Sequence, residues 1–352
     1  MAASGRYAIP AGGGRWGAGA PRPVCFCFDW AGAGRHNPGS PAVPMRLATI
    51  LPRASVEPVA VAAAPDGRWV ELAGLTGRTV PHLEDSLSWL FAHTAHLAER
   101  AATWRGPRYQ ESEFIFQPPV ARPAAVRDFD AFEVHAKTRR ARGGLALPAA
   151  WYEMPVFHFA NHHALVGHEA PVWAPRDSEA LDFGLALGVV IGRGGRDIPE
   201  RSAWEHVAGL TIVNDLAARD LELRELPAGL GPAKGRDFAT AVGPWLVTRD
   251  ELADRIVGER CALAMVARVN GRELTRGDAR SLHHPIPRLI AQAARDAELF
   301  PGDLLCTGPV GQGCILELGP ENTGGWLKPG DVVELEIERL GLLRTRIVAR
   351  PA

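Results

Sequence analysis

The chain has 352 residues, of which 46% are hydrophobic and 22% are charged, a composition typical of a globular protein with one large or two medium domains. A formal net charge of −1 provides no basic field for nucleic acid, so a nucleic-acid partner is not expected. No apolar run is long enough to span a bilayer, and the first residues lack the ordered features of a signal peptide. The five cysteines are irregularly spaced, which argues against a disulfide framework and favours a reduced, cytoplasmic protein.

The N-terminal third divides into two regions. Residues 1–44 are rich in Gly, Ala, Pro and Arg, and we interpret them as a disordered extension or as the product of a start codon placed too early. The pair Cys25 and Cys27 lies there, and two cysteines alone make a poor metal site. Residues 45–120 are predicted to form a small N-terminal domain that opens with a strand at residues 45–51.

A helix is predicted over residues 82–105, because apolar residues recur there at spacings of three and four. His93 and His96 lie three residues apart in it, but no carboxylate or cysteine accompanies them, so an ordinary helix surface is favoured over a metal site.

Residues 121–352 are predicted to be the main domain and to consist mostly of β-strands. Residues 181–191 indicate a buried strand that is apolar on both faces. Asn270-Gly271, between two alternating segments, predicts a hairpin with a type I′ turn. The other expected elements are a helix from residue 203 that runs into a strand ending at 214, a helix over 286–299, and strands at 304–306, 332–337 and 343–348.

Side chains suited to acid–base chemistry occur at several places along this domain. Asp128 and His135 lie seven residues apart, on a predicted loop entering a helix, where a carboxylate could orient a histidine that acts as a general base. Taken alone, the pair is more typical of an ordinary helix than of a catalytic site. Glu317 falls in an apolar segment that reads as a strand, where burial would raise its pKa and suit it to proton transfer, although a glutamate at the rim of a site is the plain alternative.

Charged residues that could bind an anionic substrate follow the same order. Asp215 comes at the end of an apolar strand, and Arg219, one helical turn on, could pair with it or with a substrate anion. Lys234 and Arg236 lie in a glycine-rich loop that could wrap a carboxylate. That loop lacks the phosphate-binding pattern of nucleotide-binding proteins.

Together these segments resemble the fumarylacetoacetate hydrolase family from about Val126 to Val348. The resemblance is carried by Trp151–Phe157, Leu181-Asp-Phe183, Gly188–Gly192, Gly195–Ile198, Asn214-Asp215, Ala218-Arg-Asp220, Lys234–Phe238, Gly243-Pro-Trp245 and Trp326–Asp331. It implies an α+β, mostly β fold, namely a mixed β-roll or sandwich with flanking helices behind a small N-terminal domain. It also implies a homodimer that acts on small keto or diketo acids through a His–Glu pair and a divalent metal, usually Mg²⁺ or Ca²⁺.

Carried over position by position, the resemblance assigns roles to retained residues and reveals departures. It implies metal ligation by Asp128 and Asp215, a general base in His135, its partner in Glu317 and a substrate contact by Arg219. The departures are Gly184 and Ala186 in place of two metal-binding glutamates, Arg236 in place of the loop lysine, Asp130 in place of a tyrosine, and Thr307-Gly308-Pro309 in place of a Ser-Gly-Thr turn.

Because two expected carboxylates are missing, metal affinity should be weakened or lost. Asp182, which would share a strand face with Gly184 and Ala186, could substitute as a ligand, and a softer site could form from the nearby histidines His158, His162, His163 and His168. Three hypotheses follow. The first is an enzyme with an eroded metal site that uses His135 and Glu317 for C–C hydrolysis, decarboxylation, dehydration, tautomerisation or cyclisation, while the substrate is bound by Asp130, Arg219, Lys234 and Arg236. The second is an ordinary Mg²⁺-dependent hydrolase with fewer ligands, and the third is a non-catalytic binding or scaffold subunit.

Overall fold

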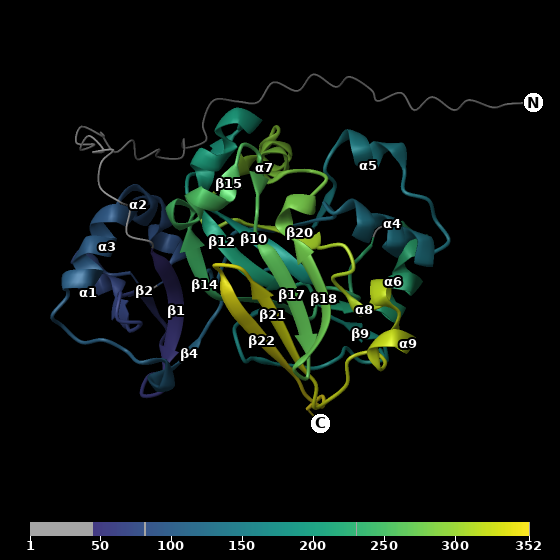
Figure 1. Ribbon diagram of the computed structural model, residues 1–352, viewed down its shortest axis with the longest axis horizontal. Coiled ribbons are helices and arrows are strands. Elements are labelled where there is room, and N and C mark those ends of the chain that lie inside the picture. The colour runs from purple at the N-terminus through teal and green to yellow at the C-terminus, as the bar shows by residue number, and fades with distance from the viewer. Residues whose placement is uncertain (1–44, 81, 230, 352) are drawn as a thin grey trace, which may run out of the picture. The chain divides into compact units, whose positions relative to one another are not determined.

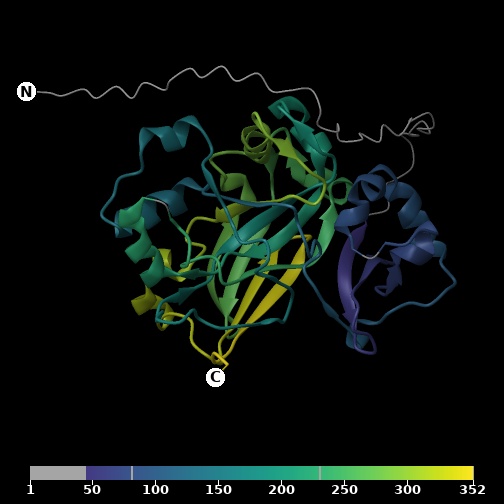
Figure 2. The same ribbon diagram turned by 180° about the vertical axis from the view of Figure 1, so that it is seen from behind.

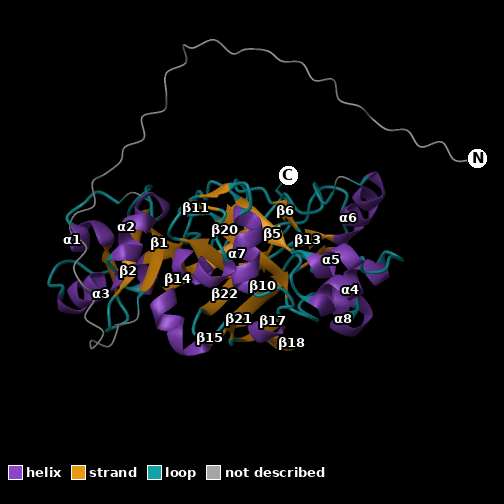
Figure 3. Cartoon of the chain, turned by 90° about the horizontal axis from the view of Figure 1, so that it is seen from above, coloured by secondary structure: helices purple, strands orange, loops and turns teal. Residues whose placement is uncertain are grey.

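The computed structural model describes residues 45–80, 82–229 and 231–351, which belong to one compact unit. The predictions for residues 1–44, including the Cys25 and Cys27 pair, fall outside the described residues. Strands dominate and helices flank them, which confirms the predicted α+β, mostly β class (Figure 3). Among the described residues, no helix is long and apolar enough to cross a membrane.

The larger sheet places the strands of the main domain beside the first strands of the chain (Figure 1). Its order is β3 (Trp69–Glu71), β2 (Val59–Ala63), β1 (Arg46–Pro52), β14 (Thr240–Thr248), β12 (Val207–Asn214), β10 (Leu185–Ile191), β20 (Leu304–Pro309), β5 (Val126–Phe129) and β6 (Phe157–Phe159), while β4 (Phe114–Phe116) pairs with β1 and β7 (Leu165–Val166) with β14. The first strands therefore continue the sheet of the main domain, and the boundary near residue 120 stays a prediction.

Strand β10 is the centre of this sheet and is buried along its whole length. Leu185, Leu187, Val189 and Ile191 pack in one hydrophobic core, whereas Ala186 and Val190 pack in another. This alternation explains why the strand is apolar on both faces, since each face covers a separate core. The predicted strand is interrupted, however, because β9 (Leu181–Asp182) ends two residues before β10 begins.

A second sheet covers one of those cores. Its order is β18 (Arg272–Asp278), β17 (Ala264–Val269), β21 (Val332–Ile337), β22 (Gly341–Ile347) and β8 (Pro171–Val172). Buried side chains of β17, β21 and β22 pack with those of β10 and β12, which makes a two-sheet sandwich. The turn of the predicted hairpin has φ of 53° at Asn270 and 75° at Gly271, as a type I′ turn requires.

The helix predicted over residues 82–105 is broken. It consists of η1 (Glu84–Ser86), α2 (Leu87–Ala92) and α3 (Thr94–Thr103), and these lie beside α1 (Leu72–Thr76). The break is at His93, whose backbone leaves the helical region while its ring stacks on Trp89 and contacts the Trp89 carbonyl oxygen at 2.7 Å. An aromatic contact thus overrides the helical periodicity at one residue.

Several of the remaining helices gather on the side of the sheets away from the first described strands, as Figure 2 shows from behind. The helices are α4 (Glu133–Arg142), α5 (Ala149–Glu153), α6 (Arg219–Glu225), α7 (Ile286–Ala294), α8 (Ile315–Leu318) and α9 (Pro320–Thr323), with 3₁₀ turns η2 (Glu111–Glu113), η3 (Glu200–His206), η4 (Leu226–Ala228), η5 (Arg249–Arg255) and η6 (Ala279–Ser281). Short strand pairs are β9 with β13 (Ala217–Ala218), β11 (Gly195–Arg196) with β19 (Glu298–Leu299), and β15 (Ile256–Val257) with β16 (Arg260–Cys261). The helix predicted over 286–299 therefore ends at residue 294, and the helix predicted from 203 is only the 3₁₀ turn η3.

Candidate active site

The sheet brings together residues that are far apart in the sequence. Asp128 lies on β5, which runs parallel to β20 and pairs with β6 on its other edge. Asp215 directly follows β12, and the backbone N–H of Asp215 donates to the carbonyl of Gly184 at 2.9 Å. Asp128 is thus on a strand and not on a loop, and His135 follows on helix α4.

His135 and Glu317 form a buried hydrogen-bonded pair. Nδ1 of His135 lies 2.8 Å from a Glu317 carboxylate oxygen, and the two side chains are only 2% and 1% exposed. The other Glu317 oxygen accepts a hydrogen bond from the backbone N–H of Gln312 at 2.9 Å. Since His135 also lines a cavity, the nitrogen left to face it is Nε2.

The prediction that Glu317 lies in a strand is wrong, because Glu317 belongs to the short helix α8. The side chain of Asp182 starts this helix by accepting the backbone N–H groups of Ile315 at 2.7 Å and Leu316 at 3.1 Å. Local periodicity could not reveal a cap that comes from more than a hundred residues earlier. The same contacts turn Asp182 away from the role of a spare metal ligand.

Cys314 lies against the His135–Glu317 pair and was missed in the sequence. Its Sγ is 3.3 Å from the Glu317 carboxylate and 3.9 Å from Nδ1 of His135, so one donor atom of each residue lies within 4.8 Å of the others. Burial raises the pKa of Cys314 well above its usual value, which keeps the thiol protonated. We interpret this cluster as a hydrogen-bonded pair with a neighbouring thiol, because the His–Glu bond already occupies the two atoms that a metal would need.

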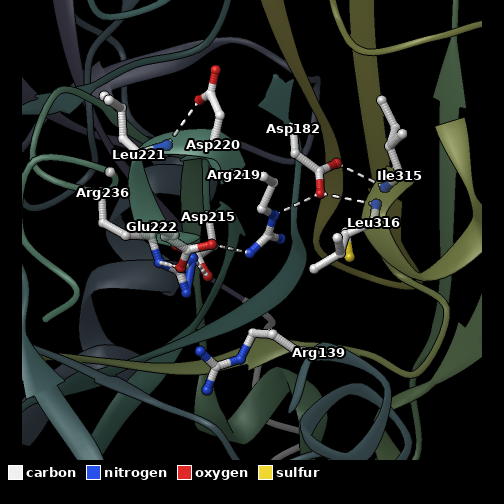
Figure 4. Close-up of polar contacts among 12 residues, drawn as sticks. Arg139, Asp182, Asp215, Arg219, Asp220, Leu221, Glu222, Arg236, Ile315 and Leu316 are labelled. Carbon is white, nitrogen blue, oxygen red and sulfur yellow. Dashed lines mark hydrogen bonds and ion pairs between the residues drawn. The ribbon is translucent and has the colours of Figure 1, made fainter. Parts of the chain in front are cut away.

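Arg236 lies close to both retained aspartates, and Figure 4 shows it beside Asp215. Its guanidinium group is 2.7 Å from a carboxylate oxygen of Asp215, 3.6 Å from one of Asp128 and 3.2 Å from one of Glu222. The side chain is 9% exposed, so these contacts are largely shielded from water. A cation from the protein itself therefore lies among three carboxylates.

Arg219 does not pair with Asp215 as the helical spacing suggested. It is buried beneath the site, where Nε donates to Asp182 at 2.8 Å and Nη1 donates to Glu222 at 2.7 Å. Glu222 thereby joins Arg219 to Arg236, a role that sequence reasoning missed although Glu222 is three residues after Arg219 on one helix face.

Burial and the two arginines set the protonation of these groups in opposite directions. Burial raises the pKa of Asp128 and of Asp215 to about 6, despite the nearby Arg236. Burial also opposes the charge of Glu222, but Arg219 and Arg236 outweigh it and lower the pKa of Glu222 to about 2. Burial thus favours the neutral forms of Asp128 and Asp215, whereas the two arginines favour the ionised form of Glu222.

The cavity beside this network has a volume of about 180 Å³. Its polar lining residues are Asp128, Asp130, His135, Arg139, His158 and Arg236. Arg139, which the sequence analysis did not single out, donates to Asp130 at 2.8 Å. His158 lies 3.6 Å from Asp128, and its burial lowers the pKa of the imidazole to about 4, so the ring is neutral.

Two predicted substrate-binding residues are not among those that line this cavity. The side chain of Lys234 is 76% exposed and its Nζ pairs with Asp237 at 2.7 Å. Arg219 is enclosed by Asp182 and Glu222. The other predicted residues do come together: Asp128, Asp130, His135 and Arg236 line the cavity. Asp215 contacts Arg236, and Glu317 contacts His135.

The residues present do not fit the divalent metal that the family resemblance implies. Mg²⁺ and Ca²⁺ prefer six or more oxygen ligands. Here Asp215 is bonded to Arg236, and a Cβ atom at Gly184 would stand 2.6 Å from the Asp215 carbonyl oxygen. Ala186 is fully buried among apolar side chains and offers no ligand. Beside the cavity, one buried oxygen of Asp128 and one of Asp130 lack a hydrogen-bond partner, and these two atoms are far fewer than the ligands that such an ion prefers.

The predicted histidine patch supplies no replacement. His158 faces Asp128, whereas Nδ1 of His168 accepts the backbone N–H of Arg344. The rings of His162 and His163 contact each other, with centroids 4.1 Å apart and planes tilted by 42°. Within the described ranges, the metal-type grouping that occurs is that of His135, Cys314 and Glu317.

A buried His–Glu pair that opens on a small cavity with two arginines in its lining is suited to acid–base chemistry beside an anion. Residues 124–348 match the family described as fumarylacetoacetate (FAA) hydrolase C-terminal. The chain is 32% identical over 257 residues to human mitochondrial oxaloacetate tautomerase FAHD2A, covering 72% of this chain and 76% of that protein. The chain belongs to the fumarylacetoacetate hydrolase family.

Other relatives differ in the reaction that their names state. The chain is 36% identical over 194 residues to 2,4-didehydro-3-deoxy-L-rhamnonate hydrolase from Sphingomonas sp., covering 55% of this chain and 65% of that protein. Fumarylacetoacetate hydrolase from Exiguobacterium antarcticum has the same fold, with a TM-score of 0.68 and 22% identity over 87% of this chain and 100% of that one. The relatives are hydrolases, isomerases and tautomerases, so the chain is an enzyme and the hypothesis of a non-catalytic subunit is set aside.

Proposed function

We propose that this enzyme interconverts the keto and enol forms of a small keto acid. The observation that carries the proposal is the His135–Glu317 pair, with Nε2 of His135 left for a cavity that also presents Arg139 and Arg236. The human relative named an oxaloacetate tautomerase supports this choice of reaction. A cavity of about 180 Å³ suits a substrate of a few carbon atoms.

In the proposed mechanism His135 moves one proton within the substrate. Nε2 takes a proton from the carbon next to the keto group, so the C–H bond breaks and its electron pair forms the enolate. The imidazolium then gives the proton to the enolate oxygen, and Glu317 stabilises the positive charge on the ring between the two steps. Arg236 and Arg139 are placed to stabilise the substrate anion and the developing enolate.

Hydrolysis of a C–C bond is the second candidate, supported by the relative named a rhamnonate-derivative hydrolase. Water attack needs a strongly polarised ketone and an activated water molecule, whereas tautomerisation needs only a base and an anion-binding group. Because the residues present do not fit a divalent metal, tautomerisation is favoured over hydrolysis.

Two further expectations remain part of the proposal. They are a cytoplasmic location, expected from the sequence, and a homodimeric state, implied by the family resemblance.

The test is a stopped-flow assay of oxaloacetate enol-to-keto conversion, with product analysis for pyruvate and for cleaved fragments. We expect catalysis of the tautomerisation without cleavage, and a loss of about 10²–10⁴-fold in His135→Gln. His163→Gln, at an exposed histidine outside the cavity, is the matched control. Cleavage of a diketo acid without any tautomerisation would establish the hydrolase instead.

A further inference from the structure

The guanidinium group of Arg236 occupies the space between Asp128 and Asp215, where two aspartates from different strands converge. It is held on three sides, since Asp215, Asp128 and Glu222 lie 2.7, 3.6 and 3.2 Å from its nitrogen atoms. Figure 4 shows Arg236 lying against Asp215 and Glu222, with Arg219 on the other side of the Glu222 carboxylate. A guanidinium has five donors in a rigid plane, so it can serve several carboxylates at once.

The backbone that carries Arg236 is fixed to helix α6. The carboxylate of Glu225 accepts the N–H groups of Ala233 at 2.9 Å, Lys234 at 2.6 Å and Gly235 at 3.2 Å. The carbonyl of Gly235 accepts the N–H of Ala218 at 2.8 Å, and a Cβ at Gly235 would meet the backbone nitrogen of Glu222 at 2.8 Å. The loop therefore presents Arg236 from a close-packed support.

A divalent ion could not share this space. Its oxygen ligands would have to stand about 2.0–2.6 Å away. Any ion that bound both aspartates would then lie within a few ångströms of a guanidinium already bonded to one of them, and two cations repel strongly in a buried site. The guanidinium group and a divalent ion would therefore compete for the same carboxylate oxygens of Asp128 and Asp215.

We propose that Arg236 is a built-in cation that replaces the divalent metal, so that the enzyme binds no metal between Asp128 and Asp215. The anion-stabilising group of the cavity is then a guanidinium that needs no loading. This inference deepens the proposed function, because it names the group that stabilises the enolate, but its main test measures ion binding and not turnover.

The first experiment is a titration of the purified full chain, stripped with chelator, with Mn²⁺ followed by electron paramagnetic resonance. We expect the unaltered protein to bind no stoichiometric Mn²⁺ at submillimolar concentrations. In Arg236→Ala, Asp128 and Asp215 lose their cation and face a vacant space, while Glu222 keeps its contact with Arg219, so we expect Mn²⁺ to bind at least tenfold more tightly than in the unaltered protein. Arg276→Ala removes the same charge at an exposed pair with Glu273 and should leave Mn²⁺ binding unchanged.

The outcomes separate this inference from the proposed function. Tight stoichiometric binding by the unaltered protein, or an Arg236→Ala protein that binds no better, would overturn the replacement of the metal whatever the activity. If Arg236→Ala does not fold, the titration of the unaltered protein still decides, and Arg236→Lys supplies a smaller cation in the same place. If the unaltered protein binds no Mn²⁺ and catalyses no tautomerisation, the proposed function fails while the replacement stands.

Discussion

Gly184 occupies a position at which even one extra carbon atom should be costly. A Cβ there would stand 2.6 Å from the Asp215 carbonyl oxygen, 2.9 Å from Cγ of Pro309 and 3.1 Å from Cβ of Asp215. Ordinary contacts begin at 3.4 Å, so the tightest contact is too short by about 0.8 Å and is made with backbone. The amide of Gly184 also donates to Asn214, which limits how far the segment can move.

We therefore expect Gly184→Ala to lower the free energy of unfolding by about 2 kcal/mol. Overpacking of a dense interior costs about 1–3 kcal/mol, and the gain of about 0.4–1 kcal/mol from a stiffer unfolded chain offsets part of it. The measurement is urea unfolding followed by tryptophan fluorescence and circular dichroism. The matched control is Gly143→Ala, where the nearest atom is 3.4 Å away and φ is −87°, and a change within about 0.5 kcal/mol is expected. Equal stability of the two variants would refute the steric argument.

Three further predictions concern charge. Glu317→Gln should lower kcat about 10²–10⁴-fold, since the amide lacks the charge that stabilises the imidazolium. It should also lower the free energy of unfolding by about 1–3 kcal/mol, because its single oxygen can accept from His135 or from the Gln312 N–H but not from both; steady-state kinetics and thermal unfolding measure the two effects. The pKa of Glu222 is lowered from 4.5 to about 2, so its carboxylate stabilises the fold by up to about 3 kcal/mol above pH 4.5, and this stabilisation is lost as the pH falls toward 2. In urea unfolding, Glu222→Gln should therefore be destabilised at pH 7 and much less at pH 3. The pKa of Asp128 is raised from 3.8 to about 6, so its contribution to the free energy of unfolding is fully present below pH 3.8 and is lost as the pH rises through 6. Relative to the unaltered protein, Asp128→Asn should therefore gain up to about 3 kcal/mol of stability at pH 8 and none at pH 3.

Sequence patterns predicted the elements whose residues decide their own conformation. The hairpin at Asn270-Gly271 formed because both residues tolerate positive φ, and β10 formed because an unbroken apolar run suits a strand covered on both faces. The patterns failed where a distant side chain intervened. Helix α8 at Glu317 depends on capping by Asp182, and no local period carries that information.

The site divides in the same way. The resemblance located His135 and Glu317, whose contact at 2.8 Å joins helices α4 and α8. It could not locate Glu222 or Arg139, because their importance lies in the charged side chains of other segments that they contact, Arg236 for Glu222 and Asp130 for Arg139. From the resemblance, Gly184 is only a position that has lost a ligand. In the structure, the Asp215 carbonyl oxygen occupies the space that a side chain at position 184 would need for its Cβ atom.

The closed space at Gly184 and the presence of Arg236 are best understood as one change in the site. Asp215 takes part in both, since its backbone carbonyl fills the volume next to Gly184 and its carboxylate bonds Arg236 at 2.7 Å. A glutamate introduced at Gly184 would thus displace the residue that holds the guanidinium, before its own carboxylate could reach an ion. Restoring a metal site would require the removal of Arg236 together with a shift of the Asp215 backbone, so Gly184→Glu alone should lose stability and gain no Mn²⁺ binding. A folded Gly184→Glu protein that binds Mn²⁺ would show that the two features are independent.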